Sequence, residues 1–124
     1  MAWRIAMRFE GRELNPYAEP VSASKLTQGS VYFAVTYVDD QMLVPTVEPL
    51  IFAGRNLDAG DVGSVVYFQD AASYRRGTRH DSIANEGEAT FFAAPDNEVR
   101  HIFEYENALD ELLRCALRSQ GGKG

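Results

Sequence analysis

The stretch that decides the fold runs from residue 29 to residue 70 and reads GSVYFAVTYVDDQMLVPTVEPLIFAGRNLDAGDVGSVVYFQD. Its apolar runs are rich in valine and aromatic residues, and each is bounded by acids, prolines or glycines. Such runs are typical of β-strands joined by tight turns. The sequence therefore predicts a β-meander built from 31–38, 42–44, 50–53 and 64–69.

The run 31–38 is apolar on both of its faces. Val31, Phe33 and Val35 alternate with Tyr32 and Ala34, so either face of a strand here carries large side chains. A strand of this kind is covered on both sides, by a closed barrel or by a helix on one face and other segments on the opposite face.

Two prolines interrupt the return strand. Pro45 and Pro49 follow the Asp39-Asp40 turn, and proline cannot donate a ladder hydrogen bond, so we expect a bend or a sheet edge there.

The segments that flank the meander complete the expected fold. Residues 3–9 alternate between large apolar and other side chains, which predicts a strand, and 88–93 reads as a last short strand. Residues 70–87 lack a clear period and are expected to form a long loop. A helix is predicted from Asp96, as its N-cap, to about Ser119, and its expected apolar face contains Val99, Ile102, Phe103, Leu109, Leu112, Leu113, Ala116 and Leu117.

These elements predict one α+β domain over residues 1–120, followed by a disordered tail at 121–124. The fold expected is a small bent antiparallel sheet, or a partly closed barrel, of about five strands with the C-terminal α-helix packed on it. The step Leu26-x-x-Gly29 into the central strand resembles the pattern of small Tudor-like barrels, which is why a barrel stays open as an alternative.

Composition narrows the function classes. The chain has 124 residues, a formal charge of −6 and a single cysteine, Cys115, so it cannot form an internal disulfide and its acidity disfavours non-specific binding of nucleic acid. No apolar run is long enough to span a membrane, and the first ten residues do not form a signal peptide, so a cytoplasmic location is expected.

The turn between the first two runs of the meander carries adjacent acids. Tyr37-Val38-Asp39-Asp40 resembles the Tyr-x-Asp-Asp hairpin of reverse transcriptases, in which paired carboxylates hold catalytic magnesium. No aspartate precedes Asp39, although that family has one on an upstream strand. The turn is therefore expected to be solvated and to hold no metal. A small hydrolase that uses Asp39, Asp40 and Asp70 remains the third of three functional hypotheses.

Basic and aromatic residues gather in the expected long loop. Tyr74, Arg75, Arg76, Arg79 and His80 follow one another closely, a composition that suits phosphate, nucleic acid or an acidic partner segment. The three arginines are expected to be exposed. Tyr37 and Tyr67 lie on the predicted strands and could add binding surface.

Glu106 falls among apolar residues on the wheel of the predicted helix. It should therefore pair with Arg4, Arg8 or Arg55, be protonated, or lie at an edge open to water. The broad apolar arc also suggests a homodimer whose interface contains Glu106, Leu109 and Leu113.

The sequence shows no credible nucleophile, metal cluster or cofactor-binding loop. A non-enzymatic binding or regulatory module that acts through protein contacts is therefore the first hypothesis. A nucleic-acid or phosphate binder that uses the loop arginines is the second.

Overall fold

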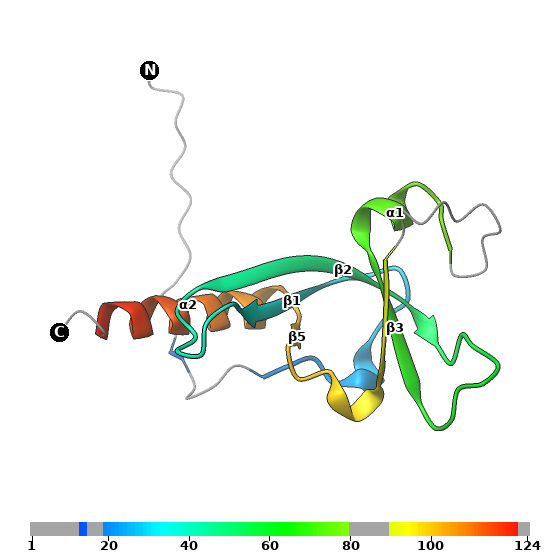
Figure 1. The fold of residues 1–124 in the computed structure, drawn as a ribbon, viewed down its shortest axis with the longest axis horizontal. Coiled ribbons are helices and arrows are strands. Elements are labelled where there is room, and N and C mark those ends of the chain that lie inside the picture. The colour runs from blue at the N-terminus through cyan, green and yellow to red at the C-terminus, as the bar shows by residue number, and fades with distance from the viewer. Residues whose placement is uncertain (1–12, 15–18, 80–89, 122–124) are drawn as a thin grey trace, which may run out of the picture.

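The computed structural model describes residues 13–14, 19–79 and 90–121 (Figure 1). The strand predicted at residues 3–9, the candidate binding residue His80 and residues 122–124 of the predicted tail lie outside these ranges. Gly121, predicted as the first residue of the disordered tail, is instead the last residue of the C-terminal helix.

The described chain forms one five-stranded antiparallel sheet in the order β4-β3-β2-β1-β5. Its strands are β1 (Val31–Tyr37), β2 (Pro45–Arg55), β3 (Val65–Asp70), β4 (Phe91–Pro95) and β5 (Ile102–Phe103). The helices are α1 (Ala71–Arg75) and α2 (Tyr105–Gly121), with 3-10 turns η1 (Ala23–Lys25) and η2 (Asp96–Glu98). The predicted α+β class is confirmed, but the two outer strands, β4 and β5, do not pair, so the sheet does not close into a barrel.

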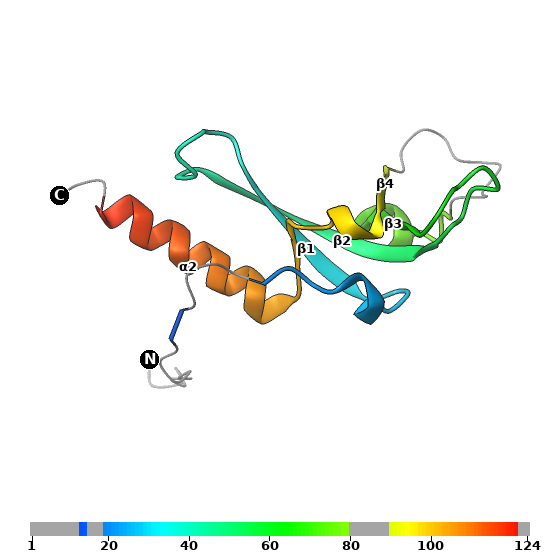
Figure 2. The same cartoon turned by 90° about the horizontal axis from the view of Figure 1, so that it is seen from below.

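Both faces of β1 are covered, as its sequence predicts. On one face Val35 packs with Phe103 and with Ala108 of α2. On the other face Tyr32 belongs to the larger core, which also contains Val21, Leu26, Leu50, Phe52, Val66, Phe68, Val99 and Ile102. The helices α1 and α2 lie toward opposite ends of the long β2 strand (Figures 1 and 2).

Pro45 and Pro49 both lie within β2, in the part of this strand that β3 does not reach. β3 pairs with β2 only from Leu50 onward, opposite Asp70. The prolines therefore mark a sheet edge, which was one of the two predicted alternatives.

The predicted helix start at Asp96 is wrong. Asp96 begins the η2 turn, and Ile102 and Phe103 form β5, which pairs with Ala34 and Phe33 of β1. Val99, Ile102 and Phe103 have helical spacing, but backbone pairing with β1 overrides that pattern.

The apolar face predicted for the helix is also partly wrong. The buried residues of α2 are Ala108, Arg114 and Cys115, whereas Leu109, Leu113 and Leu117 are exposed by 46%, 37% and 56%.

Two shorter segments differ from expectation as well. The run 42–44, expected as a strand, belongs to the turn between β1 and β2, and Met42 adopts a positive φ of 59°. The expected loop 70–87 contains α1, because the carboxylate of Asp70 accepts a hydrogen bond from the backbone N–H of Ser73 at 2.9 Å and caps this helix.

Candidate binding pocket

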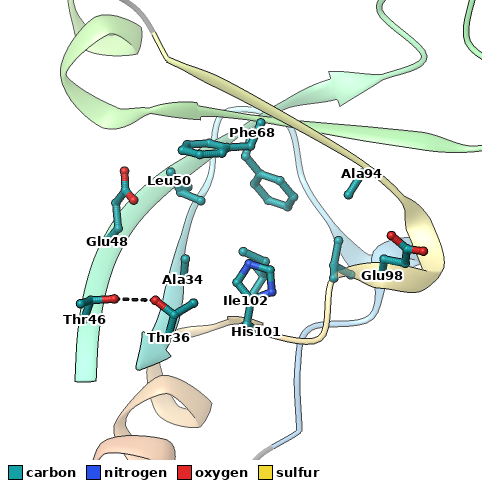
Figure 3. Close-up of a pocket in the computed structure, with 12 residues that line it drawn as sticks. Ala34, Thr36, Thr46, Glu48, Leu50, Phe68, Ala94, Glu98, His101 and Ile102 are labelled. Atoms are coloured by element: carbon teal, nitrogen blue, oxygen red, sulfur yellow. Dashed lines mark hydrogen bonds between the residues drawn. The ribbon is translucent and has the colours of Figure 1, made fainter. Parts of the chain in front are cut away.

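A cavity of about 200 Å³, here called the pocket, opens on the face of the sheet that carries the larger core (Figure 3). Every strand of the sheet contributes to its lining. The apolar lining residues are Ala34, Leu50, Phe68, Phe92, Ala94, Val99 and Ile102, and the polar ones are Thr36, Thr46, Glu48, Glu98 and His101.

Strand register brings the apolar lining together. Phe92 lies opposite Phe68 in the β3–β4 pair, and Ile102 lies opposite Ala34 in the β1–β5 pair. Residues of one strand that face the pocket are two apart, as are Ala34 and Thr36, because alternate side chains of a strand share a face. The small side chains of Ala34 and Ala94 help to leave this part of the face unfilled.

The polar residues lie around the mouth of the pocket. Figure 3 shows Glu48 and Glu98 on opposite sides, with Leu50, Phe68 and Ile102 between them. Glu48, Glu98 and His101 are exposed, and the hydroxyls of Thr36 and Thr46 contact each other at 2.5 Å. An apolar floor with two carboxylates at its mouth suits a ligand that has an apolar group and a nearby cation.

The three arginines of the predicted binding cluster differ in their exposure and in their contacts. The guanidinium of Arg79 lies 3.7 Å from the ring centroid of Tyr74. Its Nη1 donates to the carbonyls of Tyr74 at 3.0 Å and Thr78 at 2.8 Å. Arg79 is half-buried, whereas Arg75 and Arg76 are exposed. The prediction that all three are exposed is therefore wrong for Arg79, which fastens the segment that follows α1.

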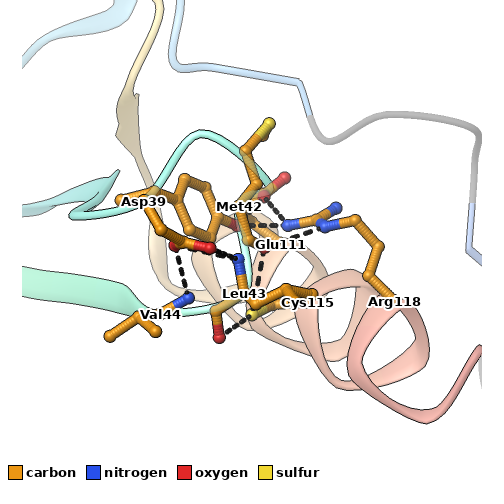
Figure 4. A network of polar contacts seen from close by, with 8 residues as sticks. Asp39, Met42, Leu43, Val44, Glu111, Cys115 and Arg118 are labelled. Carbon is orange, nitrogen blue, oxygen red and sulfur yellow. Dashed lines mark hydrogen bonds and ion pairs between the residues drawn. The ribbon is translucent and has the colours of Figure 1, made fainter. Parts of the chain in front are cut away.

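A separate polar network, which includes Glu111 and Arg118 of α2, lies beside the turn between β1 and β2 (Figure 4). Tyr37 of β1 belongs to this network. Its hydroxyl donates to the carboxylate of Glu111 and accepts from Nη2 of Arg118 at 2.7 Å. Arg118 Nη2 also forms an ion pair with Glu111 at 3.3 Å. Burial, followed by the hydrogen bond to the Glu111 carboxylate, raises the pKa of Tyr37 to about 12.

The same network holds the turn between β1 and β2 against α2. Nε of Arg118 donates to the carbonyl of Met42 at 3.0 Å. The Cys115 thiol, which is buried, lies 3.6 Å from the same carbonyl and 3.5 Å from that of Leu43. Tyr37 and Cys115 therefore have structural roles in this region.

The acids of the hydrolase hypothesis do not meet. The Asp39 carboxylate accepts from the backbone N–H groups of Leu43 and Val44, and the hydrogen bond from Val44 is the largest cause of its lowered pKa. Burial opposes ionisation of Asp70, but hydrogen bonds from Ser73 and Thr90 lower its pKa overall. Asp39 closes the turn between β1 and β2, whereas Asp70 caps α1 and lies opposite Leu50 in the middle of β2.

Metal ligands are not assembled either. The described ranges contain no group of three or more histidine, cysteine, aspartate or glutamate residues that could hold a metal ion. Within the same ranges, no helix has the length and apolarity needed to cross a membrane.

The remaining candidate residues lie apart from the pocket. The Tyr67 hydroxyl donates to the Asp61 carboxylate at 2.8 Å, and this hydrogen bond raises the pKa of Tyr67 to about 12. Glu106 is exposed in the first turn of α2, so its predicted position at an edge open to water agrees with the structure.

The pocket itself was missed from the sequence. Its lining comes from alternate positions of separate strands, and their register is not visible in a single sequence. The available signal was the even-numbered face of β1 and β2, where Ala34, Thr36 and Thr46 are small. Comparisons with protein-family models, with curated proteins and with solved structures each return no match for this chain. The described residues form a small open-sheet α+β domain with an apolar pocket beside its larger core.

Proposed function

We propose that this chain is a non-enzymatic binding module that docks a segment of a partner protein by taking one apolar side chain into the pocket. The observation that carries the proposal is the cavity of about 200 Å³ with its apolar lining. An engineered apolar cavity of about 150 Å³ admits benzene, so this pocket is large enough for one aromatic or branched aliphatic side chain.

Charge selects the kind of segment. Glu48 and Glu98 stand at the mouth of the pocket, and the chain carries a formal charge of −6. A lysine or arginine beside the apolar anchor would pair with one of these carboxylates, whereas an acidic neighbour would be repelled. The proposed partner segment therefore combines a large apolar residue with a basic one.

Selection from a display library of short random peptides on the full chain tests this function. The expected consensus is a large apolar residue with a lysine or arginine nearby. Ala94→Leu fills the pocket and should weaken binding of the selected peptides at least tenfold. Ala93→Leu is the matched control, because Ala93 is the exposed neighbour on the opposite face of β4.

A charge variant separates the contribution of the carboxylates. Glu98→Gln should weaken binding of the basic peptides several-fold. Asp40 is an exposed acid on the distant β1–β2 turn, so Asp40→Asn should leave this binding unchanged. Failure to select any peptide, or peptides that bind the Ala94→Leu variant as tightly as the wild type, would refute the proposal. Binding of nucleic acid or phosphate by the loop arginines remains a competing prediction. Binding that weakens steeply with salt and depends on Arg75 and Arg76 would favour it.

We also propose that a second copy of this chain covers the exposed face of α2. Tyr105, Leu109, Leu113 and Leu117 recur every four residues along one side of this helix and are exposed by 66%, 46%, 37% and 56%. A repeat of four forms the ridge that packs into the groove of another helix. This homodimer is independent of the pocket, which lies on the other face of the sheet.

A further inference from the structure

The outer edge of β4 presents backbone groups that are ready for another strand. The N–H of Asp70 donates to the carbonyl of Thr90, and the N–H of Asp96 donates to that of Ser64. Because inward and outward backbone groups alternate along an antiparallel strand, these two bonds direct the N–H and C=O of Phe91 and Ala93 away from β3.

These outward groups have no hydrogen-bond partner among the described residues. Ala93 is also exposed. A strand edge in this condition is a template for pairing with a further strand.

A second uncovered stretch of backbone, the part of β2 that β3 does not reach, is blocked. The bond from the Val38 N–H to the Val44 carbonyl fixes the same alternation in β2, and it directs Pro45, Val47 and Pro49 away from β1. Two of these three residues have no N–H to offer, so this edge cannot sustain a ladder. On β5, the opposite edge strand, the carbonyl of Ile102 already accepts a hydrogen bond from the N–H of Val21. Among the described residues, β4 is therefore the edge at which a strand can be added.

The pocket lies beside this same edge. Phe92 and Ala94, the two β4 residues between the outward-directed positions, both line the pocket. In a strand paired with β4, a side chain opposite Phe92 or Ala94 would lie about 5 Å from it on the same face. Ala94 has a small side chain, so a longer side chain from that position would extend over it toward the pocket.

We infer that the partner segment binds as an extended strand added to the outer edge of β4, with its backbone bonded to Phe91 and Ala93 and its apolar anchor in the pocket. This inference rests on the proposed function and specifies its geometry. Main-chain hydrogen bonds supply the affinity in this mode, and the side chains that face the pocket supply the specificity.

The strand geometry also fixes the spacing of the recognition motif. Side chains two residues apart share a face of a strand, whereas adjacent ones point to opposite faces. Glu98 lies in η2, just beyond the end of β4. The basic residue of the partner should therefore stand two positions from the apolar anchor, after it if the added strand runs parallel to β4 and before it if the strand runs antiparallel.

Backbone methylation of the selected peptide tests this mode. One peptide from the display selection is synthesised as a series in which a single backbone nitrogen is methylated at each position in turn. Strand addition predicts a period of two: methylation of nitrogens that donate to β4 should weaken binding at least tenfold, and methylation of the alternate nitrogens should have little effect.

A variant pair tests the same contact from the side of the chain. Ala93→Pro removes the outward N–H without removing a bond to β3, whereas the control Val47→Pro removes an outward N–H from the uncovered stretch of β2, which the inference does not use. The Ala93→Pro variant should lose at least tenfold in affinity and the Val47→Pro variant should bind normally. Slower hydrogen exchange of the Ala93 amide in the wild-type complex gives a readout that does not depend on either variant folding.

The outcomes separate the two proposals. If peptides bind and Ala94→Leu blocks them, but methylation shows no period of two and the Ala93 amide is not protected, strand addition is refuted and the pocket function stands. If no peptide binds the full chain, both proposals are refuted.

Discussion

Replacing Ala94 with leucine should stabilise the fold, although a larger side chain in a packed core ordinarily destabilises it. Ala94 is half-buried and borders the pocket of about 200 Å³. Leucine adds three carbons at this position, and the cavity has room for them without forcing neighbouring side chains from their rotamers.

The size of the effect follows from the burial. Each buried methylene contributes about 0.8 kcal/mol, so three fully buried carbons would contribute roughly 2.4 kcal/mol. The pocket is open to solvent on one side, so about half of that burial is realised. The expected increase in the free energy of unfolding is therefore about 1 kcal/mol, which raises the melting temperature by about 4 °C in a domain of this size.

Urea denaturation of the wild type, Ala94→Leu and Ala93→Leu measures the difference directly. Ala93→Leu should change the free energy of unfolding by less than about 0.5 kcal/mol, because its side chain stays in solvent. A loss of more than about 1 kcal/mol in Ala94→Leu would mean that the cavity is filled in solution. That result would remove the basis of the proposed binding site.

Three further outcomes follow from the described contacts. Because the folded pKa of Tyr37 is about 12 and the unfolded value about 10, the stability it supplies is complete below pH 10 and is lost as the pH rises to 12. In denaturation curves recorded across this pH range, the free energy of unfolding of Tyr37→Phe should therefore fall less than that of the wild type. Arg79→Ala should lower the free energy of unfolding by about 1 kcal/mol, whereas exposed Arg75→Ala should change it by less than about 0.5 kcal/mol; equal values would show that the Arg79 contacts add nothing. Sedimentation equilibrium should show a dimer at micromolar concentration that Leu109→Gln dissociates, and a monomeric wild type would exclude the α2 interface.

The sequence predicts the centre of this fold well because its signals are local. Alternation in 31–37, the acidic turn at Asp39 and the prolines at the edge of β2 each follow from the geometry of a few neighbouring residues. The main part of the C-terminal helix is also predictable, since its recurring leucines and the arginines toward its end are local features.

The start of that helix is not predictable from local spacing. Val99, Ile102 and Phe103 have the spacing of a helix face, yet they form a turn and β5 because β1 offers them a hydrogen-bonding partner about seventy residues earlier in the chain. A tertiary pairing of this kind leaves no trace in the periodicity of the segment itself.

The candidate site depends on register even more strongly. Several of the tyrosines and arginines that stand out in the sequence form intrachain contacts, Tyr37 with Glu111 and Arg79 with Tyr74 among them, whereas Arg75 and Arg76 are exposed. The pocket is lined instead by alanines, threonines and core residues that have no distinctive pattern. Only the pairing of β3 with β4, and of β1 with β5, brings these residues to one place.

The unequal edges of the sheet limit how copies of this chain can join. A fibre grows when each copy offers two edges, so that one strand added always exposes another. Here the prolines block the part of β2 that β3 does not reach. On β5, the outward carbonyl of Ile102 accepts a hydrogen bond from the N–H of Val21. Within the described residues, β4 is the edge left for pairing. Two copies that paired through their β4 strands would each lose this free edge, so no third copy could be added to the pair.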